Sequence, residues 1–413
     1  VTFKYLGVQV YHAERDLVDG NIQRAMRSMR GSLRFWLALP LSPMGRVSLC
    51  KMLLLPRLLY FFSALPIILP KKIFRDMHRI LGELIWGHNR HRVGLARLHS
   101  PITEGGMGVP NLELYYAAAQ LQWPTQWLAV PPSPEIAHIH HTALPTRKNI
   151  YTWLAMSSRE LAGESCLLRT ASKIWHRYVT GRTNQQPYSP LLPLAYIPRI
   201  GGAMQTHDIS DWTERGIDEI RDLYQDGSLM SFQEVMDAYD MPQSHFLRYT
   251  AVREAIIRQW EGGPAEPQVS TVLHAILSHG TARRTVSCIY TALQSVATPP
   301  CIELRERWDT DLGTPLTDTQ WNQALEHVKR VSRNMRLRYT QINYLHRTYL
   351  TPHRISRMYT GASAHCPRCR HHRADFIHMV WSCPVIAEAW QSVVRMVEEI
   401  VEAPVPLSPE SGL

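Results

Sequence analysis

The chain has 413 residues, of which 45% are hydrophobic and 19% are charged. This composition supplies enough apolar material for packed cores and excludes a disordered or low-complexity protein. The 45 Lys and Arg residues outnumber the 35 Asp and Glu residues, and the resulting net charge of +10 favours polyanionic partners. A chain of this length is expected to contain about two to four domains.

The chain opens on a strand-like run, Val-Thr-Phe-Lys-Tyr-Leu-Gly-Val, at residues 1–8. This run lacks the basic, apolar and small-residue regions of a secretory signal. The simplest interpretation is that the chain starts inside a domain, as a fragment of a longer protein.

Residues 21–37 have the periodicity of an amphipathic helix. Residues 73–85 and 386–401 show the same pattern, and Pro384 suits the first turn of the last helix. We expect each apolar stripe to pack into a core. Four arginines face away from the first stripe, at Arg24, Arg27, Arg30 and Arg34. They form either a solvated face or a polyanion-binding face.

Residues 52–69 form an apolar stretch that contains Arg57, Pro56 and Pro66. A spanning helix needs about 20 apolar residues, and a central arginine opposes insertion. We therefore expect Pro56 to divide the stretch into two helices inside a globular domain, with no membrane partner.

Charge is distributed unevenly along the sequence. The balance is +9 over residues 1–120, −8 over 201–270, +8 over 331–380 and −4 over 381–413. Together with proline-rich breaks, this predicts a mainly α fold in four regions: 1–20, 21–125, a helical region with an acidic middle at 126–325, and 326–413.

Residues 329–359 interleave arginines with tyrosines. Arginine neutralises phosphate, and both side chains stack on unpaired bases, so this pattern favours RNA or single-stranded nucleic acid. The alternative is a solvated helix with tyrosines in its core. The candidate contact residues in this segment are Arg336, Arg338, Tyr339, Arg354 and Arg357.

Three cysteines and a histidine cluster near the end of the sequence. Cys366 and Cys369 are separated by two residues, and His378 and Cys383 follow. Thiolate and imidazole ligands at this spacing predict a closed, structural zinc site. The alternative is a group of ordinary buried thiols, and His365, His371 or His372 could replace His378.

The remaining cysteines are isolated, at Cys50, Cys166, Cys288 and Cys301. They make no disulfide framework, and we expect buried thiols in a reducing compartment. This favours an intracellular protein of the nucleus and cytoplasm.

Several segments resemble the reverse transcriptases of LINE-type, non-LTR retrotransposons. The matching N-terminal segments are 3–8, 39–42, 45–47, 51–52, 55–56, 64–67, 85–86 and 105–112, and the C-terminal ones are 350–354 and the Cys366–Cys383 cluster. The two ends match over about 170 residues, whereas 125–325 matches only in being helical and bearing tryptophans.

The resemblance implies a palm-edge β segment at 1–20, a thumb-like helical domain at 21–125, a helical linker and a zinc-knuckle segment of CCHC type. It implies RNA and an RNA–DNA hybrid as partners. Tyr5 and Gly7 would lie at the strand that supports the primer terminus, and the cations near the template–primer duplex would be Arg24, Arg27, Arg46 and Lys51. Cys366, Cys369, His378 and Cys383 would be the zinc ligands.

The sequence departs from that family in one decisive respect. Polymerisation requires paired aspartates that hold two metal ions, and the chain contains no Asp-Asp dipeptide. We therefore expect magnesium only in an intact parent enzyme and no polymerisation by this chain unless a missing N-terminal half is supplied. A rival interpretation is a non-enzymatic, zinc-containing nucleic-acid-binding or scaffold protein, and a third is a decayed genomic copy.

Overall fold

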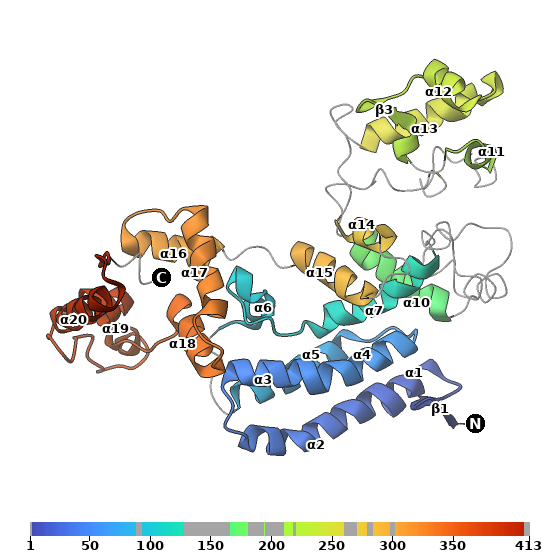
Figure 1. Ribbon diagram of the computed structural model, residues 1–413. Helices are drawn as coiled ribbons and strands as arrows, with labels where there is room; N and C mark the ends of the chain where they lie inside the picture. Colours follow the sequence, from blue (N-terminus) through green and yellow to red (C-terminus); the bar gives the residue numbers. More distant parts are fainter. Residues whose placement is uncertain are drawn as a thin grey trace. The chain divides into compact units, whose positions relative to one another are not determined.

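The computed structural model describes residues 2–87, 93–127, 166–180, 194, 210–217, 220–259, 271–278, 284–297 and 302–408. These residues are mainly helical, with two small antiparallel sheets (Figure 1). The mainly α fold class is therefore confirmed. Cys301 and most of residues 128–209 lie outside the described residues.

The chain divides into two compact units, each assembled from three separate stretches. Unit 1 comprises Val1–Arg30, Leu55–His78 and Asn111–Ala297, and unit 2 comprises Gly31–Leu54, Arg79–Pro110 and Thr298–Leu413. The four consecutive regions expected from the sequence stay predictions.

Unit 1 contains both sheets and most of the middle of the chain. Its elements are β1 (Phe3–Tyr5), β2 (Val8–Val10), α1 (Glu14–Leu17), η1 (Val18–Gln23), α4 (Leu55–Ala64), α7 (Leu112–Trp127), α10 (Cys166–Trp175), η4 (His176–Thr180), α11 (Ser210–Glu214), η7 (Ile220–Leu223), β3 (Tyr224–Gln225), β4 (Ser228–Leu229), α12 (Phe232–Tyr239), η8 (Gln243–His245), α13 (Phe246–Gln259), α14 (Thr271–Ser278) and α15 (Thr285–Ala297).

Unit 2 contains the cysteine cluster and the C-terminal helix. Its elements are α3 (Pro43–Leu49), η2 (Cys50–Leu54), α6 (Leu95–His99), η3 (Ile102–Glu104), α16 (Ile302–Leu312), α17 (Asp318–Arg330), α18 (Met335–Leu345), α19 (Pro352–Ser356), η9 (His378–Ser382) and α20 (Pro384–Val401). Two helices contribute residues to both units, α2 (Arg24–Ala38) and α5 (Lys71–Trp86).

The core of unit 1 is built around α7. This helix is apolar on nearly all sides, and it packs against α4, α10, α14 and α15. Ala117, Ala118 and Ala119 are completely buried, and their small side chains allow neighbouring helices to approach closely. Gln120 is also buried, and its amide donates to the carbonyl oxygens of Phe62 and Leu65. The polar group is therefore satisfied where α4 ends.

The short N-terminal β segment expected from the sequence is a hairpin. β1 pairs with β2 in antiparallel register, with Phe3 opposite Val10 and Tyr5 opposite Val8. Leu6 and Gly7 form the turn with φ values of +44° and +87°. Positive φ at both residues suits a tight hairpin turn, but a leucine with positive φ is strained.

Hydrophobic periodicity correctly predicts which faces of α2 and α5 are buried. Ile22, Met26, Met29 and Leu33 are buried along η1 and α2, as are the apolar positions of α5 from Ile73 to Ile85. The arginines on the other side of α2 are all exposed. For α20 the expectation of core packing is wrong, because none of its residues is buried.

The predicted break at Pro56 is also wrong. The chain is helical from Pro43 to Ala64, and α4 begins at Leu55. Pro56 falls in the first turn of α4, where a missing N–H is tolerated, and the π-helical turn η2 immediately precedes it. This stretch is long and apolar enough to cross a membrane, but a single helix of this kind is weak evidence for a membrane span. In the structure 28% of its most apolar part is buried.

Candidate metal centre and basic surfaces

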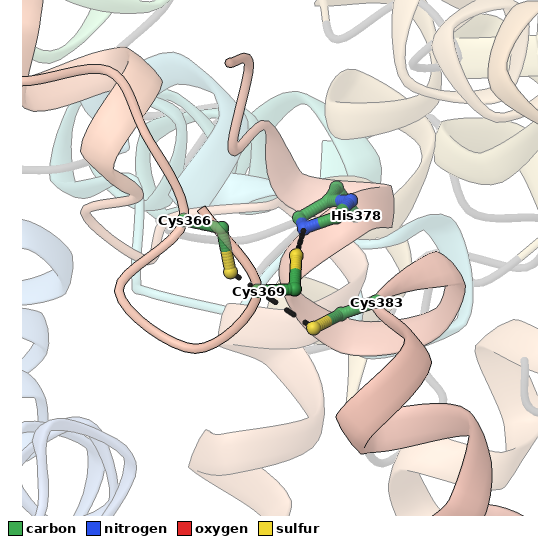
Figure 2. A group of neighbouring side chains, drawn as sticks. All are labelled: Cys366, Cys369, His378 and Cys383. Carbon is green, nitrogen blue, oxygen red and sulfur yellow. Dashed lines mark hydrogen bonds between the residues drawn. The ribbon is translucent and has the colours of Figure 1, made fainter. Parts of the chain in front are cut away.

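The four predicted metal ligands converge from a loop and two helical elements of unit 2. Cys366 and Cys369 lie in the loop that follows α19, His378 begins η9, and Cys383 is the N-cap of α20 (Figure 2). The loop closes on itself because the Cys366 amide donates to the His371 carbonyl and the Arg370 amide donates to the Cys366 carbonyl. Local turns of this kind are what a two-residue spacing between cysteines favours.

The side-chain geometry fits a tetrahedral ion. One potential ligand atom from each residue lies within 4.8 Å of all the others. The Sγ atoms of Cys366 and Cys383 are 3.9 Å apart, and the Sγ of Cys369 is 3.3 Å from Nε2 of His378. A tetrahedron with Zn–S bonds of about 2.3 Å separates two sulfurs by about 3.8 Å. The four residues could therefore hold a metal ion in the arrangement that the spacing predicted.

The environment of Cys366 favours the metal-binding thiolate form. Burial raises the pKa of Cys366, but backbone hydrogen bonds at Cys369 and Arg368 and a bond with His378 lower this pKa more, to about 6. For Cys369, a backbone hydrogen bond at His371 lowers the pKa, while burial and neighbouring thiols raise it, and the net shift is upward. Of these two thiols, Cys366 therefore forms the thiolate more easily.

The surrounding residues orient the ligands. Asp375 accepts a hydrogen bond from the His378 amide at 3.0 Å, which fixes the start of η9. Arg368 donates to the Met379 carbonyl at 2.9 Å and Trp390 donates to the Val380 carbonyl at 2.9 Å. Supporting bonds like these hold a metal site in shape.

The alternative histidines lie outside the cluster. His365, His371 and His372 are exposed. His371 stacks on His378 with ring centres 4.6 Å apart, and its Nδ1 lies 3.1 Å from the Arg373 carbonyl oxygen. His378 is the histidine whose ring nitrogen joins the three thiols.

An aromatic core anchors this module within unit 2. Phe376 packs with Trp308 and Leu316, and Tyr344 lies against the same cluster. The Arg347 guanidinium carbon lies 4.1 Å from the centre of the Trp308 ring, and Arg347 pairs with Asp311. Burial lowers the pKa of Arg347, and Asp311 opposes this shift. This arginine and Tyr344, both in the basic–aromatic segment, therefore have a packing role.

Some of the other predicted contact residues of this segment are engaged with the backbone. Arg336 donates to Pro40 O at 3.3 Å, Arg338 donates to Ser332 O at 2.6 Å, and Arg354 donates to Arg347 O at 3.2 Å. Arg336, Arg354 and Arg357 are exposed, whereas Arg338 and Tyr339 are half-buried. The exposed guanidinium groups remain accessible to a polyanion.

The two other predicted cations of unit 2 are Arg46, at the end of α5, and Lys51, beside the glycine-rich segment. Arg46 is half-buried, and its guanidinium lies 3.4 Å from the carbonyl oxygens of Leu84 and Ile85, so it caps the end of α5. Lys51 is exposed. If Gly108 carried a Cβ atom, that atom would lie 3.0 Å from Nζ of Lys51. Arg46 thus has a structural role that the sequence did not indicate.

The glycine-rich segment itself has a steric explanation. Gly105 and Gly108 have φ values of +81° and +62°. A Cβ on Gly106 would lie 1.9 Å from the Ser100 carbonyl oxygen, so only glycine fits there.

The remaining predicted residues lie on or near an open pocket of unit 1. Tyr5 is exposed on β1, Gly7 is in the hairpin turn, and Arg24 and Arg27 are exposed on α2. The pocket has a volume of about 530 Å³, and its lining includes Gly7 and Arg24. The sequence did not single out the other side chains that line it: Lys4, Gln9, Asn21, Ala25, Ser28, Pro56, Arg57, Tyr60 and Phe61.

The walls of this pocket are tied together by specific hydrogen bonds. The Asn21 side chain accepts from the Gln9 amide and donates to the Gln9 carbonyl, both at 2.8 Å. The Tyr60 hydroxyl donates to the Leu6 carbonyl oxygen and so joins the hairpin turn to α4. Spacing along α4 offers a faint signal, since Arg57, Tyr60 and Phe61 lie on one helix face.

Chemically, unit 1 offers a cationic, aromatic-walled pocket, and unit 2 offers a closed site for a thiophilic ion beside exposed arginines. No family model matches the chain. The function of the chain must therefore be inferred from these residues and their geometry.

Proposed function

We propose that this chain is the nucleic-acid-holding part of a LINE-type reverse transcriptase and that it binds RNA or an RNA–DNA hybrid. The observation that carries the proposal is the pocket of unit 1. Lys4, Arg24 and Arg57 bring three cations from a strand and two helices to one opening, and Tyr60 and Phe61 line it. A polyanion with stackable bases is the ligand class that combines these two requirements.

The hairpin beside the pocket supports the same proposal. Phe3, Tyr5 and Leu6 are exposed large side chains on this hairpin. Leu6 also has positive φ, which costs about 1 kcal/mol and is rare for such a residue. Strain of this kind is found where a backbone is shaped for binding.

For the cysteine cluster we propose zinc, bound structurally by Cys366, Cys369, His378 and Cys383. Three thiolates and an imidazole select zinc over magnesium or calcium. Four protein ligands leave no position for a substrate, so the ion would hold the loop and the first turn of α20 together. Metal analysis of protein purified with zinc should give one zinc per chain. Cobalt substitution should give the absorption bands of tetrahedral thiolate coordination, and a metal-free chain would contradict the proposal.

RNA binding at two salt concentrations tests the main proposal. Affinity for an RNA hairpin should fall by about 10³-fold or more between 50 and 200 mM salt if six or more phosphates are contacted. A Lys4→Ala, Arg57→Ala double variant should reduce the salt slope by about two, because each lost phosphate contact reduces it by about one.

The matched control is Lys72→Ala, Lys173→Ala, which removes two exposed cations of unit 1 that do not line the pocket. Equal losses in both double variants would mean that only overall charge matters. Tyr60→Ala should weaken binding more than Tyr60→Phe, which keeps the stacking face. Weak, salt-independent binding by the unmodified chain would overturn the proposal.

We further propose that the chain does not polymerise alone, because it has no Asp-Asp pair to hold catalytic magnesium. Primer extension with magnesium should need the missing N-terminal half of the parent. Extension by this chain alone would contradict this.

The second candidate is a non-enzymatic nucleic-acid-binding or scaffold protein with the same zinc module. The exposed apolar face of α20 favours a protein-docking role.

A further inference from the structure

The C-terminal helix α20 presents an apolar stripe to solvent within its own unit. Val393, Met396, Val397 and Ile400 follow the spacing of one helix face. Val393 is 46% exposed, Met396 62% and Ile400 74%. Among the described elements α20 packs mainly on η9, through its first turns. The outer half of the stripe is therefore left without a packing partner in unit 2.

The stripe is an ordered surface. At the start of α20, the amides of Ile386 and Ala387 donate to the Cys383 carbonyl, and Ile386 packs against the cysteine cluster. At its end, the Glu398 carboxylate accepts a hydrogen bond from the Val405 amide at 2.9 Å, so the chain turns back after the helix. A partner would therefore meet a preformed helix and would not have to pay the full cost of ordering it.

The charges around the stripe are acidic. Glu399 lies beside Met396 at one edge of the stripe, Glu398 lies beyond Val394 on the other side of the helix, and Glu402 follows at the C-cap. Arg395 is the helix's one basic residue, and it is two positions from both Val393 and Val397, on the opposite face. The C-terminal end of a helix adds partial negative charge to the same region. The complementary occupant has apolar residues flanked by lysine or arginine.

We propose that α20 is a docking helix for a basic amphipathic helix of another protein. This inference goes beyond nucleic-acid binding and uses neither the pocket of unit 1 nor metal chemistry. The occupant packs its own apolar stripe on Val393, Met396, Val397 and Ile400, and its flanking cations face Glu399 and the negative C-terminal end of the helix.

A second copy of the chain fits the charges less well. Pairing of two α20 helices in either direction brings acidic flanks together, because no basic side chain flanks the stripe. Like charges at a helix interface oppose pairing, and opposite charges specify the partner. The charges therefore favour a heterotypic pair.

A synthetic peptide pair tests this with the full, zinc-loaded chain. The probe is an 18-residue labelled peptide with leucines at i, i+3, i+4 and i+7 of each repeat and lysines on the flanks. Its control has glutamates in place of the lysines. Fluorescence anisotropy should show binding of the lysine peptide and at least tenfold weaker binding of the glutamate peptide.

Two single variants distinguish the stripe from general charge attraction. Ile400→Asp should weaken binding of the lysine peptide at least tenfold, because it places a charge in the apolar contact. Gln391→Asp adds the same charge away from the stripe and should change affinity less than twofold. If binding were only attraction to acidic residues, neither variant would weaken it. Hydrogen exchange of α20 is measured in both variants as a control. Both should keep the helix, because the side chains of Gln391 and Ile400 are exposed.

Three results would overturn the proposal. One is equal binding of the two peptides, and another is no binding of either, which would show that the stripe is covered within the chain. The third is a dimer in light scattering that Ile400→Asp dissociates, which would identify a second copy as the occupant. Loss of RNA binding at the pocket would leave this inference untouched, since the two tests share no residue.

Discussion

Removal of the metal should unfold the cysteine loop selectively. The perturbation is Cys383→Ser, with zinc chelation of the unmodified chain as the parallel experiment. The buried cluster around the ligands consists only of Cys366, Ala374 and Cys383, with Cys369, Met379 and Ile386 against it. Phe376 anchors the end of the segment in the aromatic core. Around the ligands themselves, one buried alanine and a few partly covered side chains cannot order the backbone, because each ordered residue costs about 1–2 kcal/mol.

The expected magnitude follows from that small core. Structural zinc contributes about 10–16 kcal/mol to the folding of small modules, which corresponds to a factor of about 10⁷ or more. Loss of the ion should therefore abolish the loop's order and not merely loosen it. The reporters are the amides of Cys366, Arg370, Ala374 and Cys383, which donate hydrogen bonds within or beside the loop at 2.8–3.0 Å.

Hydrogen exchange with mass spectrometry is the assay. Peptides covering residues 364–383 should lose protection on chelation or in Cys383→Ser, whereas peptides from α7 should not change. Zinc should restore protection in the unmodified chain only. Cys288→Ser is the matched control, because Cys288 lies on α15 of unit 1 and is not one of the four clustered residues. Retained protection of the four reporter amides in metal-free protein would refute the reasoning.

Three further predictions concern stability and the pocket. A Cβ at Gly31 would meet no atom within 4 Å, so Gly31→Ala should stabilise α2 by about 0.5–1 kcal/mol, seen as about 2- to 5-fold slower hydrogen exchange; faster exchange would contradict this. Burial lowers the pKa of His346 below its ordinary 6.5, although its bond to Gly105 O opposes this. The unfolded state therefore takes up the proton first, and stability present above pH 6.5 is lost as the pH falls from there through the lower folded pKa. His346→Gln should therefore reduce the loss of stability between pH 7.5 and pH 5.5, measured as the shift in the urea midpoint of unfolding. An unchanged shift would mean that other groups cause the pH dependence. Asn21→Leu should release Gln9 of the hairpin from η1, speed hydrogen exchange of β2 and weaken RNA binding, and unchanged RNA affinity would show that the hairpin need not be held.

Local features were readable from the sequence. The burial of Met26, Met29 and the apolar face of α5 follows from helical spacing alone, because a helix places every third or fourth residue on one side. The cysteine cluster was equally readable, since its ligands lie within 18 residues and short turns bring them together. The glycines at 105–108 matched a known pattern, and positive φ and close backbone contact explain them.

Long-range juxtapositions were not readable, because spacing along a chain says nothing of what packs against a face. Periodicity found the stripe on α20 but wrongly assigned it to a core, since an apolar face looks the same in sequence whether it is covered or exposed. Arg347 lies in the basic–aromatic segment for which the sequence favoured nucleic-acid binding, but Trp308 and Asp311 surround it. The convergence of Lys4 with Arg57 depends on how a hairpin docks against α4, through bonds between residues 54 positions apart. Such contacts arise from three-dimensional packing, which no local pattern encodes.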